Sequence, residues 1–106
     1  MSLVSNTADY DYIILEVYKI ECLGCMVMKP KWNAMIEHAQ EEGQDRLHFA
    51  KMVNTQSKAE GLHEKLSIKV VPYLAAIKTG SDWGNLDYEI PEDKHFLQEW
   101  ISKFFQ

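Results

Sequence analysis

A run of apolar residues that ends directly in a pair of cysteines constrains the fold of this chain more than any other feature. Residues 12–20 (YIILEVYKI) are almost continuously apolar, with Glu16 as the single acid, and this predicts a strand buried on both faces of a sheet. Cys22 and Cys25, the only cysteines, follow it and open a segment with helical periodicity. A helix N-terminus offers free backbone N–H groups and the positive end of the macrodipole, which favour a thiolate. The sequence therefore predicts a reactive dithiol at a strand-to-helix junction.

Length and composition indicate one ordinary globular domain. The chain has 106 residues, of which 46% are hydrophobic, so residues 1–106 are expected to form a single domain that begins with an irregular segment, 1–11. No apolar run approaches the roughly 20 residues of a membrane helix. The net charge of −5 includes no basic cluster beyond Lys29 and Lys31, so neither nucleic acid nor a membrane is expected as a partner. Two cysteines are too few for a disulfide scaffold, which favours a reactive or metal-binding pair.

Further elements follow from hydrophobic periodicity and turn signals. The first helix, residues 23–42, contains Pro30, where a kink is expected, and Gly43 is placed to cap its C-terminus. The last helix is expected to begin at Glu92 or Asp93. The order β-α-β-α-β-β-α predicts an α/β fold with a mixed sheet, parallel at first and antiparallel at the end, and helices on both faces. One face of the last helix carries Phe96, Leu97, Trp100, Ile101 and Phe104. The remaining predicted segments are a helix at 57–66 and strands at 47–53, 70–77 and 86–90.

Four features lie at mutually consistent spacings along the chain. Glu16 comes six residues before the C-x-x-C pair, Pro30 comes five residues after it, and a Val71-Pro72 step opens the third strand. With these features the chain resembles the thioredoxin superfamily, and most closely the catalytic domains of protein disulfide isomerases. The resemblance covers residues 12–104 and implies the thioredoxin fold. Eleven residues cannot supply the family's first strand and helix, so a minimal or trimmed version of that fold is expected. The matching segments are 14–18, 22–25, 49–55, 71–74 and 88–101.

The sequence departs from the family pattern around the cysteines. Glu21 stands where the family usually has an aromatic residue, and Leu23-Gly24 replaces the common Gly-His or Gly-Pro pair. The isomerase arginine falls at Glu92. A carboxylate beside Cys22 opposes its thiolate, and the missing histidine removes a stabilising group. Both changes indicate a weaker oxidant or a reductase rather than a strong oxidant.

The resemblance also implies roles for the residues of the site. Cys22 is the expected nucleophile, and Cys25 is the buried thiol that resolves a mixed disulfide; an inert disulfide or two buried thiols is the structural alternative. Glu16 is implied as the proton acceptor for Cys25, with a pKa raised by burial; the alternative is a carboxylate at an exposed strand edge. Lys51 matches a lysine that lies near this glutamate in disulfide isomerases, and a solvated strand lysine is the alternative.

Pro72 is expected to form a cis peptide bond. Proline fixes φ and cannot donate a ladder hydrogen bond, so its place at a strand start is informative. The resemblance implies that Pro72 packs next to the dithiol and leaves the Val71 backbone free to pair with an extended substrate. A trans proline on an edge strand is the alternative.

These interpretations combine into a thiol-disulfide oxidoreductase that acts on protein disulfides and resembles an isomerase. The expected partners are protein substrates with disulfides or thiols, and a redox partner protein or glutathione; the domain is expected to act as a monomer without a bound cofactor. An isomerase would work in the lumen of the endoplasmic reticulum and a thioredoxin-like reductase in the cytoplasm. The alternatives are a protein-binding module of the same fold with little catalysis, and a dimer linked by metal through C-x-x-C.

A metal site within one chain is a further alternative. Cys22-x2-Cys25-x12-His38 matches the first three ligands of a zinc-finger spacing, but His48 lies too far along the chain to be the fourth. His38 also falls in the middle of a predicted helix, where a surface histidine is the commoner explanation. Trp83, in a segment rich in turn residues, either covers one end of the sheet or contacts a partner.

Overall fold

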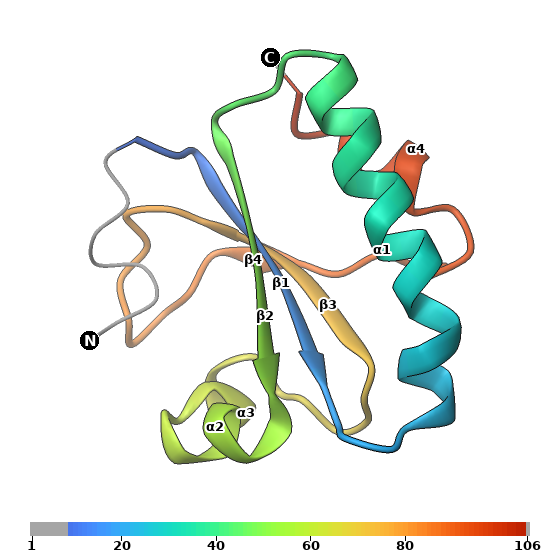
Figure 1. Cartoon of the computed structure of the whole chain (residues 1–106). Helices are drawn as coiled ribbons and strands as arrows, with labels where there is room; N and C mark the ends of the chain where they lie inside the picture. Colours follow the sequence, from blue (N-terminus) through green and yellow to red (C-terminus); the bar gives the residue numbers. More distant parts are fainter. Residues whose placement is uncertain (1–8, 106) are drawn as a thin grey trace.

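A four-stranded sheet with helices on both faces forms the centre of the computed structural model, which describes residues 9–105 (Figure 1). The predicted irregular segment lies outside the described residues at 1–8, and residues 9–11 form neither helix nor strand. The elements are β1 (Tyr12–Tyr18), α1 (Leu23–Glu41), β2 (Leu47–Val53), α2 (Asn54–Ala59), α3 (Leu62–Lys65), β3 (Tyr73–Lys78), β4 (Tyr88–Glu89) and α4 (Leu97–Ser102).

The sheet has the predicted mixed topology, with strand order β2-β1-β3-β4. β1 pairs with β2 in parallel and with β3 in antiparallel, and β4 extends the sheet in antiparallel beside β3. β1 is therefore a central strand, and its residues 13–17 are buried, which confirms the interpretation of the apolar run. Glu16 thus lies in the middle of the sheet, between Lys51 of β2 and Leu74 of β3.

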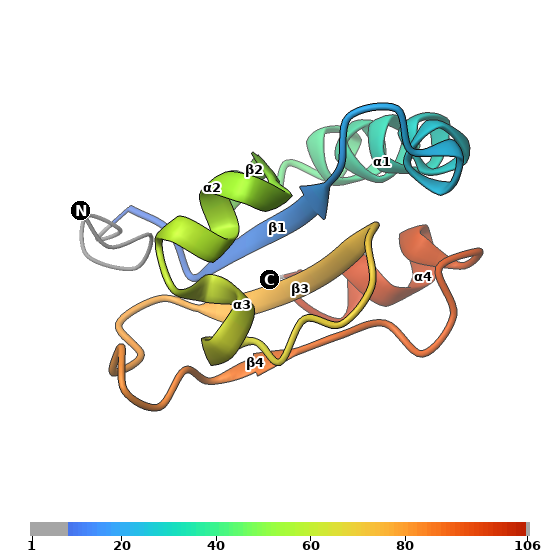
Figure 2. The ribbon, with the colours of Figure 1, turned by 90° about the horizontal axis from the view of Figure 1, so that it is seen from below.

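The two faces of β1 belong to two separate hydrophobic cores. Ile13, Leu15 and Val17 pack with residues of α3 on one face, and Ile14 packs with α1 and α4 on the other. Figure 2 shows α1 and α4 on one side of the sheet and α2 and α3 on the opposite side. Because side chains alternate along a strand, Glu16 points to the same side as Ile14. The buried carboxyl group therefore lies beneath α1, the helix that the cysteines begin.

Several predicted boundaries were wrong. β1 ends at Tyr18 rather than at residue 20. The helix predicted at 57–66 is two short helices, because Gly61 between them adopts the left-handed conformation at φ 80°. β3 begins only after Pro72, and β4 has two residues instead of five. α4 begins at Leu97, five residues after Glu92, and Phe96 precedes it with 56% of its surface exposed instead of facing the core.

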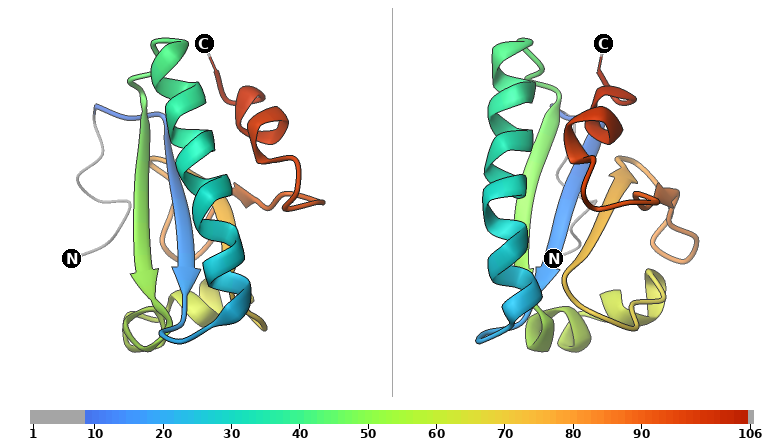
Figure 3. Two further views of the ribbon diagram at one scale, coloured as in Figure 1. Left: turned by 45° about the vertical axis from the view of Figure 1, so that its right-hand side comes forward. Right: turned by 90° about the vertical axis from the view of Figure 1, so that its right-hand side faces the viewer.

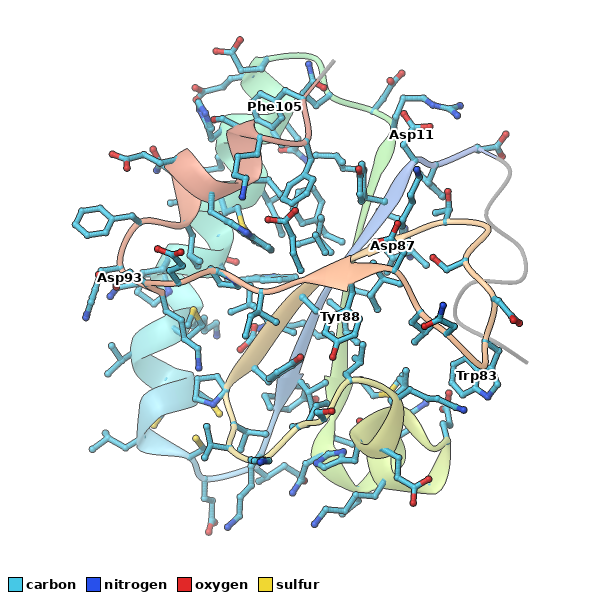
Figure 4. The ribbon with its side chains drawn as sticks, turned by 180° about the vertical axis from the view of Figure 1, so that it is seen from behind. Asp11, Trp83, Asp87, Tyr88, Asp93 and Phe105 are labelled. Carbon is cyan, nitrogen blue, oxygen red and sulfur yellow. The ribbon has the colours of Figure 1, made fainter. Side chains whose placement is uncertain are left out.

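α1 is one helix that includes Pro30, and Gly43 follows its end at φ 68°, the left-handed conformation predicted for a helix C-terminus. Trp83 (Figure 4) packs against the core on the α3 face. The Lys65 ammonium lies 5.9 Å from the centroid of its ring. None of the helices in the described part of the chain is long and apolar enough to cross a membrane.

Candidate active site

The two cysteines lie at the start of α1, directly after the turn that follows β1. Figure 3 shows this turn at the end of the molecule to which β1 and β2 both run. Cys22 is the N-cap residue, with extended backbone dihedrals, and its Sγ accepts a hydrogen bond from the Cys25 backbone N–H at 3.2 Å. Both cysteines are free thiols. The first sulfur therefore occupies the place where helix N-termini stabilise negative charge.

This environment lowers the pKa of the Cys22 thiol. The largest contribution is a hydrogen bond from the Cys25 side chain, and the backbone N–H groups of Cys25 and Gly24 and the charge of Lys19 add to it. Partial burial opposes the shift without reversing it. A lowered pKa increases the fraction of thiolate, the form that attacks a disulfide.

The same geometry raises the pKa of Cys25. Burial contributes most, followed by the hydrogen bond that Cys25 gives to Cys22 and by the charges of the Cys22 thiolate and Glu16. Cys25 is partly exposed, like Cys22, so the prediction of a buried resolving thiol was wrong. The two thiols thus differ in acidity because hydrogen bonds stabilise the Cys22 thiolate, whereas burial and the hydrogen bond that Cys25 donates to Cys22 disfavour ionisation of Cys25.

Pro72 forms the predicted cis peptide bond with Val71, and its ring lies against Gly24, between the two cysteines in sequence. A Cβ atom added at Gly24 would lie 3.2 Å from Pro72 Cδ and 4.0 Å from Cys22 Sγ. Gly24 therefore allows the proline ring to approach the first turn of α1, and this explains why the second position of the C-x-x-C linker is small. Within residues 9–105, no hydrogen bond is formed by the N–H or C=O of Val71, which precedes the β1–β3 ladder.

Glu16 is buried beneath this site, with 1% of its surface exposed. Burial raises the pKa of its carboxyl group, and the nearby charges of Lys51 and Lys94 partly offset that shift. Lys51 Nζ lies 3.7 Å from Glu16 Oε1, and that oxygen accepts no hydrogen bond from the described residues. A poorly solvated carboxyl group beside a thiol can take or give a proton near neutral pH.

Lys51 fits the resemblance in position, because it neighbours Glu16 across the β1–β2 ladder. Its ammonium group also lies 5.8 Å from the centroid of the Trp32 ring and 5.9 Å from that of Tyr18. The side chain is 40% exposed, so solvent screens the ion pair with Glu16. Lys51 is therefore a partner of the buried carboxylate, held between aromatic rings, rather than a lysine surrounded by water.

Lys51→Met is expected to destabilise the fold in a pH-dependent way. Without the ammonium, the pKa of Glu16 rises further, so the unfolding free energy falls by about 1 kcal/mol at pH 7. Below the ordinary glutamate pKa of 4.5 the carboxyl is protonated in the folded and unfolded states, and this electrostatic loss disappears. Urea unfolding at pH 7 and pH 4 measures the difference, with the exposed Lys29→Met as control. An equal loss at both pH values would contradict the ion-pair account.

Two lysines, Lys94 and Lys19, belong to the site although the sequence analysis did not single them out. The charge of Lys19 lowers the pKa of Cys22, as described above. Lys94 Nζ donates a hydrogen bond to the Pro72 carbonyl oxygen, and its charge lowers the pKa of Glu16. The resemblance directed attention to Glu92, two residues earlier. Only the approach of the loop before α4 to Pro72 reveals Lys94, and this tertiary contact has no signature in the local sequence.

Glu21 lies beside the dithiol but is not the charge with the largest effect on it. The residue is exposed and adopts a left-handed backbone conformation at φ 60°, in the turn between β1 and α1. The largest charge effect on the Cys22 thiol comes from Lys19, which lowers its pKa. The predicted opposition between Glu21 and the thiolate is therefore outweighed by a lysine of the same turn.

The zinc-like spacing does not bring its residues together. His38 Nε2 lies 3.2 Å from Ser102 Oγ, and the centroid of its ring lies 5.3 Å from that of Phe105, with the two ring planes tilted by 38°. Sixteen residues of helix separate it from Cys22, about 24 Å along the axis. Figure 4 shows Phe105 at the end of α1 opposite to the dithiol. Among residues 9–105, no group of three or more His, Cys, Asp or Glu side chains is placed to hold a metal ion.

Comparison with known proteins identifies similar structures. No family model and no curated protein sequence matches this chain. The first thioredoxin domain of mouse protein disulfide-isomerase A4 is similar with a TM-score of 0.67 and 21% identity over 92% of this chain and 63% of that chain. This chain therefore spans less than two thirds of that relative.

Two further structures show the same likeness. The Trx4 domain of ERdj5 has a TM-score of 0.62 and 13% identity, over 89% of this chain and 75% of its own. The oxidised thioredoxin of Plasmodium falciparum has a TM-score of 0.59 and 17% identity, over 92% and 84%. Identities this low establish a shared architecture, and function has to be argued from the site.

Proposed function

Because this chain has the thioredoxin fold, with two free thiols at the first turn of its long helix, we propose that it is a thiol-disulfide oxidoreductase of the disulfide isomerase type. The observation that carries the proposal is the position of Cys22 Sγ, which accepts the Cys25 N–H at 3.2 Å at the N-cap of α1 beside Pro72. This position favours a nucleophilic thiolate that an extended substrate can reach.

The reaction consists of two exchanges. The Cys22 thiolate attacks one sulfur of a substrate disulfide, which forms a mixed disulfide and releases the other sulfur as a thiolate. Cys25 then loses its proton and attacks Cys22 Sγ, which breaks the mixed disulfide and releases the second substrate thiol. The substrate disulfide is reduced and the Cys22–Cys25 pair is oxidised. A redox partner protein or glutathione returns the pair to the dithiol.

Glu16 and the Val71-Pro72 step support these exchanges. Glu16 acts on Cys25, because the pKa of that thiol is raised and a proton must leave before it can attack. The free main-chain groups of Val71 pair with an extended substrate segment, which adds a short strand beside the cysteines. Lys51 and Lys94 lower the pKa of this carboxyl against the opposing effect of burial, so both lysines favour its ionised, proton-accepting form.

The activity is tested by the reduction of insulin in the presence of dithiothreitol. We expect catalysis above the reaction without protein, and no catalysis by a variant in which both cysteines are serine. The refolding of scrambled ribonuclease distinguishes an isomerase from a simple reductase. Normal folding without catalysis in either assay would favour a binding module of the same fold, which the exposed side chains of Leu23 and Met26 beside the cysteines also suit. Metal bound to a dimer, measured by mass spectrometry, would favour the metal-linked alternative.

A further inference from the structure

Two shallow grooves meet at Lys94 beside the dithiol. The α1 groove, of about 390 Å³, runs along the first turns of α1 and includes Leu23, Val27 and Lys31 as well as Pro72 and Lys94. Residues 23, 27 and 31 are four apart and therefore follow one face of the helix. The groove includes Gly24, and a Cβ atom placed on Gly24 would lie 4.0 Å from Cys22 Sγ. The end of the groove at the start of α1 therefore adjoins the attacking sulfur.

The β3 groove, of about 220 Å³, continues this surface beyond Lys94. It includes Val70 and Ile90, which come from the loops before β3 and before α4, and Lys69. Val70 precedes the two residues of the cis peptide bond. A substrate segment paired with the Val71 main chain would therefore cross both grooves. Residues on one side of the substrate cysteine would lie over the α1 groove, and residues on its other side would lie over the β3 groove.

Both grooves expose aliphatic side chains to solvent. Leu23 and Val27 are 77% and 55% exposed, and Val70 and Ile90 are 68% and 51% exposed. Scattered apolar residues are normal on a protein surface, but four that line two adjoining grooves form an apolar patch that a partner can cover. Apolar side chains of a substrate that cover this patch would remove both their own surface and that of the four aliphatic residues from water, which favours binding.

The charge of the grooves is opposite to that of the chain. Lys31, Lys69 and Lys94 line them and no Asp or Glu does, although acidic residues outnumber Lys and Arg by 16 to 11 in the chain. Within residues 9–105, none of the three lysines forms an ion pair. Lys94 donates to the Pro72 carbonyl and Lys31 Nζ contacts His95 Nδ1, and neither partner is a carboxylate. The three positive charges therefore remain available to a ligand.

We propose that the grooves select disulfide-bonded protein segments in which the cysteine is flanked by both aliphatic and acidic residues. The aliphatic side chains lie on the apolar patch, and the carboxylates lie near the three lysines. This inference rests on the proposed function, because the selected segment is the one that Cys22 attacks. Electrostatic complementarity of this kind raises the rate of association and fixes the register of the bound segment, in addition to its effect on affinity.

The test uses four peptides that differ only beside their single cysteine. The flanking residues are Leu or Ser combined with Glu or Lys, and each cysteine carries 2-mercaptoethanol as a neutral mixed disulfide. Reduced protein is mixed with each peptide and the second-order rate of protein oxidation is measured after acid quenching. We expect the Leu-Glu peptide to react roughly tenfold faster than the Ser-Lys peptide. Equal rates would overturn the proposal.

Variants that change the charge of the grooves test whether the lysines cause the preference for acidic peptides. K31E/K69E is expected to prefer the Leu-Lys peptide over Leu-Glu, the reverse of the unmodified protein, and K31Q/K69Q is expected to lose the charge preference. K29E/K58E is the control, because it makes the same change in net charge, from −5 to −9 (−5 − 4), at exposed lysines outside the grooves. A control that also reverses the preference would overturn the assignment to the grooves.

Bis(2-hydroxyethyl) disulfide separates this proposal from the one on which it rests. The molecule is small and neutral, so its reduction depends on the dithiol and not on the grooves. Reduction of this disulfide without discrimination among the peptides would refute only the selectivity. Failure to reduce it would refute the proposed function, and the selectivity with it.

Discussion

Cys22→Ser is expected to abolish thiol-disulfide exchange, whereas Cys25→Ser is expected to stop the reaction at the mixed disulfide between Cys22 and the substrate. Cys22 Sγ is the sulfur at the helix N-terminus, and its pKa is lowered while that of Cys25 is raised. Loss of the attacking thiolate should reduce the rate of insulin reduction by roughly a thousandfold or more, as when other enzymes lose a covalent nucleophile. Cys25→Ser keeps the nucleophile but cannot resolve the mixed disulfide, so a covalent adduct with substrate should accumulate.

Mass spectrometry under non-reducing conditions measures both outcomes. Protein incubated with a peptide disulfide and then alkylated should gain the mass of one peptide in Cys25→Ser, and should gain little in Cys22→Ser. Thermal unfolding of both variants controls for loss of the fold. If the adduct accumulates on Cys25 in Cys22→Ser at the same rate, the two cysteines do not have the roles proposed here.

Glu16→Gln is expected to make the protein more stable and less active. In the folded chain, burial raises the pKa of Glu16, so the ionised carboxyl is stabilised less there than in the unfolded chain. Glutamine keeps the size of the side chain without its charge. The variant should therefore gain unfolding free energy on the order of 1 kcal/mol at pH 7. The decay of the mixed disulfide should slow by roughly a hundredfold, because a general base for Cys25 is lost.

The pH dependence identifies the cause of the added stability. The stability associated with the raised pKa of Glu16 is fully present below the unfolded value near 4.5 and is lost as the pH rises through the folded pKa. Glutamine has no proton to lose, so the variant and the unmodified protein should differ at pH 7 and agree near pH 4. Urea unfolding at several pH values measures this difference.

Glu37→Gln is the matched control for Glu16→Gln. It removes one negative charge from an exposed position of α1. We expect neither a stability gain nor a slower mixed disulfide in this variant. If Glu16→Gln resolved the mixed disulfide as fast as the control, Glu16 would have a structural role and no role in proton transfer.

The order of elements and the main features of the site could be predicted because each depends on a strong local signal. The run at 12–20 is apolar enough to favour a central strand, and the buried part of that strand, residues 13–17, contains Glu16. The place of Pro72 at the start of a predicted strand was informative, and the resemblance to the thioredoxin superfamily implied the cis Val71–Pro72 bond that the structure has. Alternation then places Glu16 beneath the helix that starts at Cys22.

The parts that the sequence could not show depend on tertiary contacts or on weak local preferences. Phe96 lies where helical periodicity includes it, but Asp93 Oδ1 accepts the N–H of His95 and holds a turn there, so the helix begins later. Lys94 reaches Pro72 across 22 positions of sequence, and no pattern of spacing signals that contact. The exposure of Cys25 depends on how closely neighbouring loops cover the first turn of α1, which composition does not determine.

The equilibrium of the Cys22–Cys25 pair with glutathione tests the central claim most directly. Protein is equilibrated at a series of ratios of reduced to oxidised glutathione, and the free thiols are alkylated and counted by mass. A redox-active dithiol should pass through one reversible transition, with a reduction potential between about −270 mV, typical of thioredoxin, and about −180 mV, typical of disulfide isomerase. Two thiols that form no disulfide at any ratio, or a disulfide that persists below about −300 mV as structural disulfides do, would contradict the account.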